Sequence, residues 1–161
     1  MVIEPWSGVT MLSSLFVEQG LSVFGCVEIV PMLQELAKWL HQGALVDGDF
    51  YAQRWRQWKD LVPVGHRVDV LTGGFACVTL SSAGKQLAQK DPRSRQLWDT
   101  MEMAIFFEVR AVLLENVVQL VDDDGGHRLL SQADEVALEF GYSRVHVWRR
   151  KHSSCGGGSQ R

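Results

Sequence analysis

Residues 67–84 read RVDVLTGGFACVTLSSAG, where a short apolar segment runs into a glycine pair, a cysteine and several small hydroxyl residues. The apolar segment at 67–72 is typical of a buried strand, because its β-branched residues are bounded by glycine. Glycines allow the chain that leaves such a strand to turn sharply and to approach a ligand closely. Cys77 is therefore either a nucleophile at a strand end or a small apolar residue.

The rest of the chain repeats this strand-then-turn pattern in alternation with helical patterns. Further strands are predicted at 2–4, 21–29, 44–46, 111–117 and 144–148. Apolar residues at three- and four-residue spacing predict helices at 11–20, 31–43, 52–61, 93–109 and 127–141. Such alternation predicts an α/β fold with a mostly parallel sheet and helices on both faces.

The composition indicates an ordinary globular protein of 161 residues, which we expect to form a single domain over 1–161. It is 46% hydrophobic and 22% charged, which excludes a disordered or fibrous chain. The net charge of −3 provides no general basic surface for nucleic acid. The Gly- and Ser-rich residues 152–161 are predicted to form a flexible tail.

The cysteine pattern and the apolar runs predict an intracellular protein. The three cysteines include no CxxC pair, which favours a reducing compartment over a disulfide framework. No apolar run reaches the length of a membrane span, and the N-terminus MVIEPW does not resemble a signal peptide. We therefore expect no membrane association.

Chemically reactive residues follow the predicted strands. In a parallel sheet, ligands bind beyond the carboxyl ends of the strands. The residues at these positions are Trp6 to Gly8, Glu28, Asp49, the glycine pair with Cys77, and Glu115 with Asn116. Carboxylates and a thiol are thus expected along one edge of the sheet, which a purely structural sheet does not require.

In order and spacing, these residues resemble the amino-terminal catalytic part of the DNA (cytosine-5) methyltransferases. The family pattern G-G-x-P-C-Q-x-x-S-x-x-G is similar to GGFACVTLSSAG, which keeps Gly73, Gly74, Cys77, Ser81 and Gly84. The family's D-x-R is matched by Asp91 and Arg93, and E-N-V stands intact at 115–117. The resemblance covers nearly the whole chain and implies a Rossmann-like S-adenosylmethionine-dependent methyltransferase fold.

The sequence departs from the family at two loops. Trp6 replaces the phenylalanine of F-x-G-x-G-G, and Thr10 and Met11 replace its glycine pair. Ala76 and Val78 replace the proline and glutamine that flank the family's cysteine. Because glycine permits backbone angles that threonine disfavours, we expect a weakened cofactor turn. Loss of the proline predicts a less rigid cysteine loop.

The resemblance implies catalysis through a covalent cysteine adduct. Cys77 would add to carbon 6 of cytosine, since a thiolate is a strong nucleophile. Glu115 would hold the ring at nitrogen 3, a role that suits a carboxyl whose pKa is raised in a closed pocket. Carbon 5 would then take a methyl group from S-adenosyl-L-methionine. The target base must leave the stack to reach the site.

The resemblance also implies the binding residues. Glu28 would meet the ribose hydroxyls, Asp49 the adenine amino group and Trp6 the adenine ring. The full expected cofactor set is Trp6, Gly8, Glu28, Asp49 and Gly74, and the residues expected to contact the base are Ala76 and Asn116. No metal site is predicted, because the run Asp122 to Asp124 is typical of a solvated helix boundary.

The resemblance ends at Gln160 and Arg161, which correspond to the start of the family's Q-x-R-x-R motif. The fold is therefore expected to be truncated at its C-terminus and to lack the target-recognition region. DNA is the expected partner, bound weakly and without sequence preference. Two alternatives stay open: a catalytically degenerate nucleotide-binding module, and a transfer-RNA cytosine-5 methyltransferase. The expected location is the nucleus in a eukaryote and the cytoplasm in a prokaryote.

Overall fold

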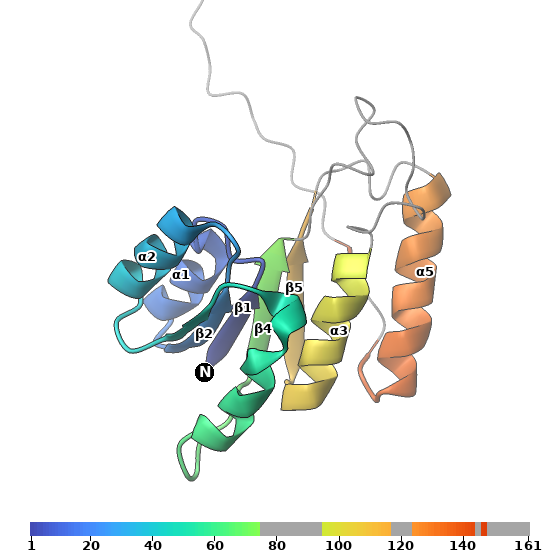
Figure 1. The fold of residues 1–161 in the computed structure, drawn as a ribbon. Coiled ribbons are helices and arrows are strands. Elements are labelled where there is room, and N and C mark those ends of the chain that lie inside the picture. The colour runs from blue at the N-terminus through green and yellow to red at the C-terminus, as the bar shows by residue number, and fades with distance from the viewer. Residues whose placement is uncertain (75–94, 117–123, 144–145, 148–161) are drawn as a thin grey trace, which may run out of the picture.

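The computed structural model describes residues 1–74, 95–116, 124–143 and 146–147. In this part of the chain, five strands form one sheet in the order β3-β2-β1-β4-β5, and all neighbouring pairs are parallel (Figure 1). The strands are β1 (Val2–Pro5), β2 (Val23–Val27), β3 (Leu45–Asp47), β4 (Val70–Gly74) and β5 (Ala111–Glu115). The chain moves outward from β1 to β3 and returns to the other side of β1, so the strand order reverses between β1 and β4.

Helices cover the sheet on two sides. They are α1 (Met11–Glu18), α2 (Pro31–Leu40), α3 (Gln96–Phe107) and α5 (Asp124–Glu139), together with the 3-10 helices η1 (Phe50–Ala52) and η2 (Arg54–Leu61). Helix α1 packs on β1 and β4, and α2 packs on β2 and β3. Figure 1 shows α1 and α2 on one side of the strands, with α3 and α5 on the other. Helix α2 begins with Pro31, whose fixed φ suits a first helical position.

The main core lies between the sheet and the layer formed by η2 and α3. Its buried members include Ile3, Phe24, Trp55, Trp58, Leu71, Met103 and Phe107. A Cβ added to Gly25 would lie 2.4 Å from the ring atom Cζ3 of Trp58. The indole therefore lies directly against the backbone of β2, and any larger residue at position 25 would displace it.

Helix α5 packs against α3 rather than directly on the centre of the sheet. Leu97 of α3 and Ala133 of α5 form a second buried cluster. Beyond α5, the Tyr142 hydroxyl donates a hydrogen bond to the carbonyl of Val109 at 2.8 Å. Among the described helices, none is long and apolar enough to cross a membrane.

These findings confirm the predicted fold class and correct two details. The helical pattern at 52–61 forms 3-10 turns, and Gln53, at φ 55°, interrupts the backbone between η1 and η2. Of the strand predicted at 144–148, His146 and Val147 belong to no regular element, and the other positions lie outside the described residues. The loop with Ala76 and Cys77, the acidic run at 122–123 and the tail 152–161 also lie outside them.

Candidate cofactor and catalytic site

The turn Trp6–Thr10 connects β1 to α1 at the carboxyl edge of the sheet. Trp6, Gly8 and Thr10 all have left-handed backbone conformations, with φ of 58°, 50° and 56°. The amide of Thr10 closes the turn by donating to the Ser7 carbonyl at 2.7 Å. Thr10 stands where the motif F-x-G-x-G-G has a glycine. Because threonine is β-branched, this backbone conformation costs strain energy. The turn is tight although Thr10 is not a glycine.

Glu28 holds this turn against the end of β2. Its Oε2 accepts a hydrogen bond from the Gly8 amide at 2.7 Å, and its Oε1 accepts one from the Val30 amide at 2.9 Å. Glu28 as a whole is 8% exposed. A carboxylate has about four acceptor positions, so two backbone donors leave capacity for ribose hydroxyls. Glu28 thus connects the turn to the end of β2 through two backbone hydrogen bonds.

Two carboxylates lie at the carboxyl end of β3, Asp47 as its last residue and Asp49 two positions later, and they have different surroundings. Asp49 Oδ1 accepts a hydrogen bond from the Tyr51 amide at 2.9 Å and so caps η1. Asp47, which the sequence analysis did not single out, is buried and accepts from Arg54 Nε at 3.1 Å. Burial acts to raise the pKa of Asp47, but the Arg54 guanidinium and backbone donors outweigh it and hold that pKa below its usual range.

Trp6 is fixed between η1 and α3. Its indole Nε1 donates a hydrogen bond to Thr100 Oγ1 at 3.0 Å. Its ring stacks on Phe50, with ring centroids 4.8 Å apart, and Tyr51 lies at 6.0 Å. These contacts place an aromatic group at the strand edge, while the predicted contact of Trp6 with adenine stays a prediction.

Gly74 and Glu115 lie side by side at the ends of β4 and β5. They are register partners, and a Cβ added to Gly74 would lie 3.4 Å from Glu115 Oε2. Glu115 is exposed, and Asn116 follows it directly. The residues that come after Gly74 lead to Cys77, three positions further on in the sequence. The structure therefore brings Glu115 to the point where the cysteine loop begins.

The residues at this edge fit the cofactor that the sequence implies. A Cβ added to Gly8 would meet no atom within 4 Å, so the turn opens onto free space. The Ser7 hydroxyl is buried and has no hydrogen-bond partner. An open turn with a polar group and a neighbouring carboxylate suits a ligand that carries a ribose and an amino-acid end. No three His, Cys, Asp or Glu residues in the described ranges are placed to hold a metal ion.

Sequence reasoning missed Glu4, which lies beneath the turn on β1. Its side chain is 2% exposed, and its Oε2 has no hydrogen-bond partner. The sequence signal for it is a charged residue inside the otherwise apolar strand VIEP.

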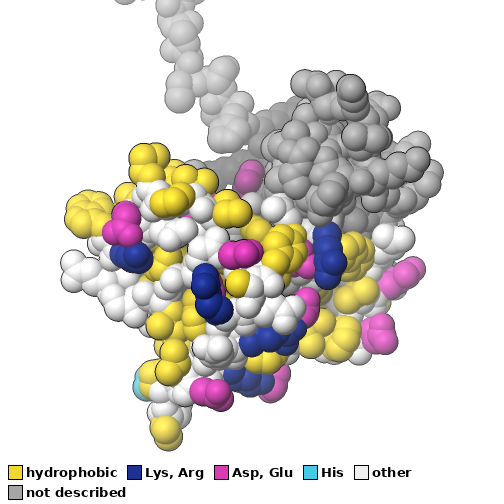
Figure 2. Space-filling model, viewed as in Figure 1, with side chains coloured by type: hydrophobic (Ala, Val, Ile, Leu, Met, Phe, Trp, Pro, Cys, Tyr) yellow, Lys and Arg dark blue, Asp and Glu magenta, His cyan; other side chains and the backbone are white. Residues whose placement is uncertain are grey.

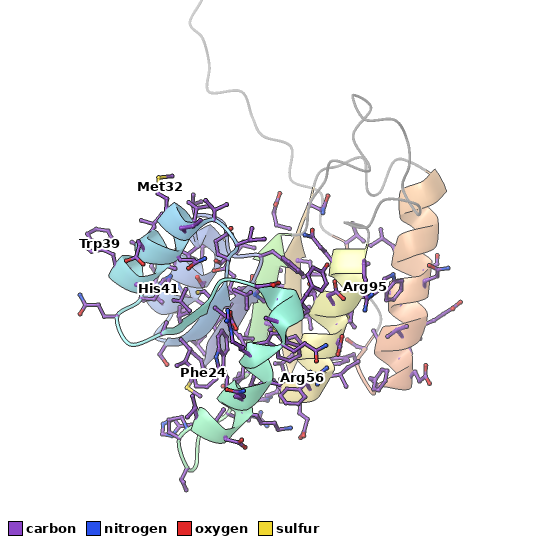
Figure 3. All side chains as sticks on the ribbon, in the orientation of Figure 1. Phe24, Met32, Trp39, His41, Arg56 and Arg95 are labelled. Atoms are coloured by element: carbon purple, nitrogen blue, oxygen red, sulfur yellow. The ribbon has the colours of Figure 1, made fainter. Side chains whose placement is uncertain are left out.

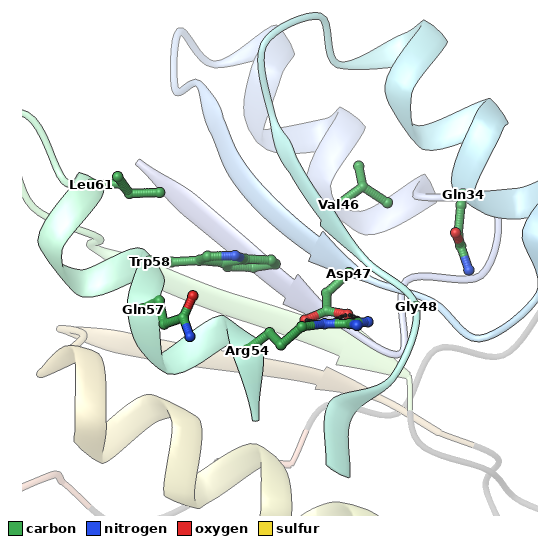
Figure 4. A pocket seen from close by; sticks show the side chains of 8 residues that line it. All are labelled: Gln34, Val46, Asp47, Gly48, Arg54, Gln57, Trp58 and Leu61. Atoms are coloured by element: carbon green, nitrogen blue, oxygen red, sulfur yellow. Dashed lines mark hydrogen bonds and ion pairs between the residues drawn. The ribbon is translucent and has the colours of Figure 1, made fainter. Parts of the chain in front are cut away.

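A shallow hollow of about 440 Å³ lies elsewhere, along the free edge of β3 (Figure 4). It is lined by Gln34, Val46, Asp47, Gly48, Arg54, Gln57, Trp58 and Leu61. None of the predicted site residues lines this hollow. The hollow is therefore separate from the turn and from the Gly74–Glu115 pair.

Positive charges on the face formed by η2 and α3 have acidic partners. Arg56 pairs with Glu102, Lys59 with Glu108, and Arg95 with Asp99. Figure 3 places Arg56 and Arg95 over this part of the molecule, and Figure 2 shows blue and magenta groups next to one another there. On this face the structure agrees with the absence of a basic footprint in the composition. Met32 and Trp39, by contrast, project from the outer side of α2 (Figure 3).

Comparison with known proteins gives a family match along most of the chain. The model of the C-5 cytosine-specific DNA methylase family matches residues 2–155. The chain is 37% identical over 83 residues to Type II methyltransferase M.PspPI of Psychrobacter sp. (strain TA137), which is 52% of this chain and 20% of that protein. It is 29% identical over 148 residues to Type II methyltransferase M.Sau96I of Staphylococcus aureus, which is 88% of this chain and 32% of that protein.

A solved structure supports the fold. The chain resembles a crystal structure of a Spodoptera frugiperda DNMT2 mutant with a TM-score of 0.55 and 19% identity, over 83% of this chain and 41% of that one. At this identity the likeness concerns the fold alone.

The chain spans only part of the length of the two curated relatives: 20% of M.PspPI and 32% of M.Sau96I.

Proposed function

Because the chain belongs to the C-5 cytosine-specific DNA methylase family, we propose that it forms the part of a DNA (cytosine-5) methyltransferase that holds S-adenosyl-L-methionine and attacks the base. Family membership and the fold agree with the resemblance that the motifs indicated. The activity, the cofactor and the DNA partner belong to the proposal, since the chain corresponds to 32% of M.Sau96I and 20% of M.PspPI.

One observation carries the proposal: Gly74 and Glu115 are register partners at the carboxyl edge of the sheet. The segment that carries the proposed nucleophile, Cys77, follows Gly74 in the sequence, and the proposed acid, Glu115, ends the strand next to β4. Glu28 and the turn Trp6–Thr10 lie at the same edge, on β2 and β1. In a parallel sheet this edge is where ligands bind.

The residues would divide the chemistry as follows. The Cys77 thiolate forms a bond to carbon 6 of a cytosine that has left the stack, and Glu115 gives a proton to nitrogen 3 as the ring becomes an enamine. S-adenosyl-L-methionine supplies the methyl group that carbon 5 takes. Loss of the carbon-5 proton to a solvent base, with return of the nitrogen-3 proton to Glu115, then expels the Cys77 thiolate and restores the neutral aromatic ring. Asn116 and the backbone at Ala76 would hold the base in place.

The cofactor site is tested by calorimetric titration of S-adenosylhomocysteine into the purified chain. We expect micromolar binding that Glu28→Ala abolishes, because Glu28 orients both the turn and the ribose. Glu35→Ala on the exposed side of α2 is the matched control and should bind like the unchanged chain. Circular dichroism shows whether Glu28→Ala is still folded. A folded, unchanged chain that gives no heat would contradict the proposed cofactor site.

The nucleophile is tested by covalent trapping with DNA that contains 5-fluorocytosine. With S-adenosyl-L-methionine added as the methyl donor, fluorine at carbon 5 leaves no proton to remove, so the final elimination is blocked and the adduct should accumulate and survive denaturing electrophoresis. Cys77→Ala should remove it. An adduct with transfer RNA in place of DNA would instead support the RNA methyltransferase.

A nucleotide-binding module without catalysis is the second candidate. The strained Thr10 favours it, because it stands where the family pattern has a glycine and takes φ 56° at an energetic cost. Binding of S-adenosylhomocysteine with no adduct on either nucleic acid would support this reading.

A further inference from the structure

We propose that Thr100 of α3 is a positioning residue for the cofactor site: its hydroxyl orients the Trp6 indole, so that the indole presents a fixed ring to the adenine of the ligand. The effect on ligand binding rests on the function proposed above, whereas the orientation of Trp6 by Thr100 does not. Neither the motifs nor the family match assigns a role to Thr100.

Trp6 combines a strained backbone with a side chain that two distant elements hold. Its φ of 58° is unfavourable for a bulky residue, and such a conformation persists only where the surroundings impose it. The indole Nε1 donates a hydrogen bond to Thr100 Oγ1 of α3 at 3.0 Å. The ring stacks on Phe50 of η1, with the ring centroids 4.8 Å apart. A stacking contact and a directed hydrogen bond together fix both the plane of the ring and its rotation within that plane.

The Thr100 hydroxyl is itself held in one orientation. It donates to the Gln96 carbonyl, one turn earlier in α3, at 2.6 Å. A hydroxyl has one proton and two lone pairs, so this bond uses the proton and leaves the oxygen as an acceptor for the indole N–H. Thr100 therefore suits a side chain that donates at position 6. Phenylalanine, the residue of the family pattern there, has no N–H and would leave this acceptor unused.

Thr100 can reach a ligand only through Trp6. Thr100 is fully buried, whereas Trp6 is half-buried and keeps exposed surface at the end of β1. The layer behind the indole is fixed as well, because the Tyr51 hydroxyl donates to Asp99 Oδ2 at 2.9 Å and so ties η1 to α3. An indole that is already oriented loses little conformational freedom when a flat ring binds against it, which favours affinity.

Proton NMR of the Trp6 indole N–H tests the orientation. The signal is identified among those of the six tryptophans by its absence in Trp6→Phe. Thr100→Val keeps the shape of the side chain and removes the acceptor, so we expect the indole proton to exchange with water about five-fold faster or more. Thr100→Ser restores the hydroxyl and should restore slow exchange. Glu35→Ala, on the exposed side of α2, is the matched control.

A second variant keeps the test valid if Thr100→Val does not fold. Thr100→Ala removes the hydroxyl without placing a methyl group against the indole N–H, and it should give the same faster exchange. An indole proton that exchanges alike in the unchanged chain and in the folded variant would overturn the proposal, since the hydroxyl would then not hold the ring.

Calorimetric titration of S-adenosylhomocysteine tests the effect on the ligand. We expect Thr100→Val to bind about five-fold more weakly, the usual contribution of one hydrogen bond, and Thr100→Ser to bind like the unchanged chain. In the Trp6→Phe background, Thr100→Val should cause no further loss, because no indole N–H is left to orient. A purely structural role for Thr100 would lower the melting temperature in both backgrounds and leave the affinity of the folded protein unchanged.

The outcomes separate this proposal from the proposed function. Binding to the unchanged chain that Thr100→Val leaves unaltered, or an equal loss in the Trp6→Phe background, would overturn the positioning role and leave the cofactor site intact. No binding to the unchanged chain would contradict the proposed function instead, and the indole exchange would still decide whether Thr100 holds Trp6.

Discussion

Thr10 adopts a left-handed backbone conformation in the turn, although its β-branched side chain disfavours that conformation. It is fully buried, has φ 56° and ψ 28°, and carries a hydroxyl without a hydrogen-bond partner. Left-handed backbone costs a β-branched residue about 1–3 kcal/mol. The surrounding contacts compensate, since the Thr10 carbonyl accepts hydrogen bonds from the Ser14 amide and hydroxyl at 3.1 and 2.8 Å.

We expect Thr10→Gly to raise the free energy of unfolding by about 1 kcal/mol, because it removes the backbone strain and the unpaired hydroxyl at the cost of one buried methyl group. Urea denaturation measures the change. Thr10→Ala is the matched control, since it also removes the hydroxyl and the methyl group but keeps a Cβ at positive φ. Alanine more stable than glycine at this position would show that the left-handed conformation does not govern the turn.

At the residue scale, the sequence predicted Glu28 at the carboxyl end of a strand, and the structure adds its hydrogen bonds with the backbone amides of Gly8 and Val30. The sequence did not predict a special role for Glu4 or Asp47. Both are buried carboxyls whose surroundings come from other elements: α1 for Glu4, and η2, through Arg54, for Asp47. Strand spacing can place such residues on a face, but the partners that set their pKa values come from distant sequence.

At the element scale, strand β4 illustrates why adjacent glycines have different roles. A Cβ on Gly73 would lie 2.5 Å from the Pro5 carbonyl oxygen of β1, which is backbone and cannot move aside. A Cβ on Gly74 would meet its nearest atom, Glu115 Oε2, at 3.4 Å. Gly73 is therefore required by sheet packing, whereas Gly74 leaves room at the site.

We expect Gly73→Ala to lower the free energy of unfolding by about 2–3 kcal/mol and Gly74→Ala to lower it by less than about 1 kcal/mol. The two variants are each other's control, because they add the same methyl group to neighbouring positions of one strand. Thermal denaturation followed by circular dichroism measures both. Equal losses would mean that β1 and β4 are not packed as closely as the structure shows.

The periodicity of apolar residues predicted where helices form, but it did not predict whether a helix is an α-helix or a 3-10 helix. The 52–61 segment has the apolar spacing of a helix and forms η2, whose buried Trp55 and Trp58 face the sheet. It is a 3-10 helix that starts after Gln53 at φ 55°. Short-range spacing does not distinguish the two helix types, since both bring residues three apart to one side.

At the scale of the whole molecule, stability should depend on pH through Glu4. Its pKa rises from 4.5 to about 7 on folding, so the native state binds the extra proton between these pH values. The contribution of Glu4 to the free energy of unfolding is fully present below pH 4.5 and is lost as the pH rises through 7. The total loss is about 3 kcal/mol. His41 acts in the opposite direction, because burial lowers its pKa.

The difference between the unchanged chain and Glu4→Gln isolates this contribution. We expect the stability of the unchanged chain, relative to the variant, to fall by about 3 kcal/mol between pH 4.5 and 8 in urea denaturation. A difference that is constant over this range would mean that Glu4 titrates alike in the folded and unfolded states. Below pH 4, protonation of Asp47 should destabilise both proteins alike, because Arg54 lowers the pKa of that group in the folded state.

The sequence by itself determined the alternation of strands and helices, the family, and the order of reactive residues along the chain. These depend on local spacing and on short motifs, which a single sequence displays directly. The tertiary structure decided which of those residues are neighbours: Glu28 with Gly8, and Gly74 with Glu115. Strand order, register and the burial of a carboxyl depend on packing between segments far apart in the chain, and only the folded sheet brings those segments together.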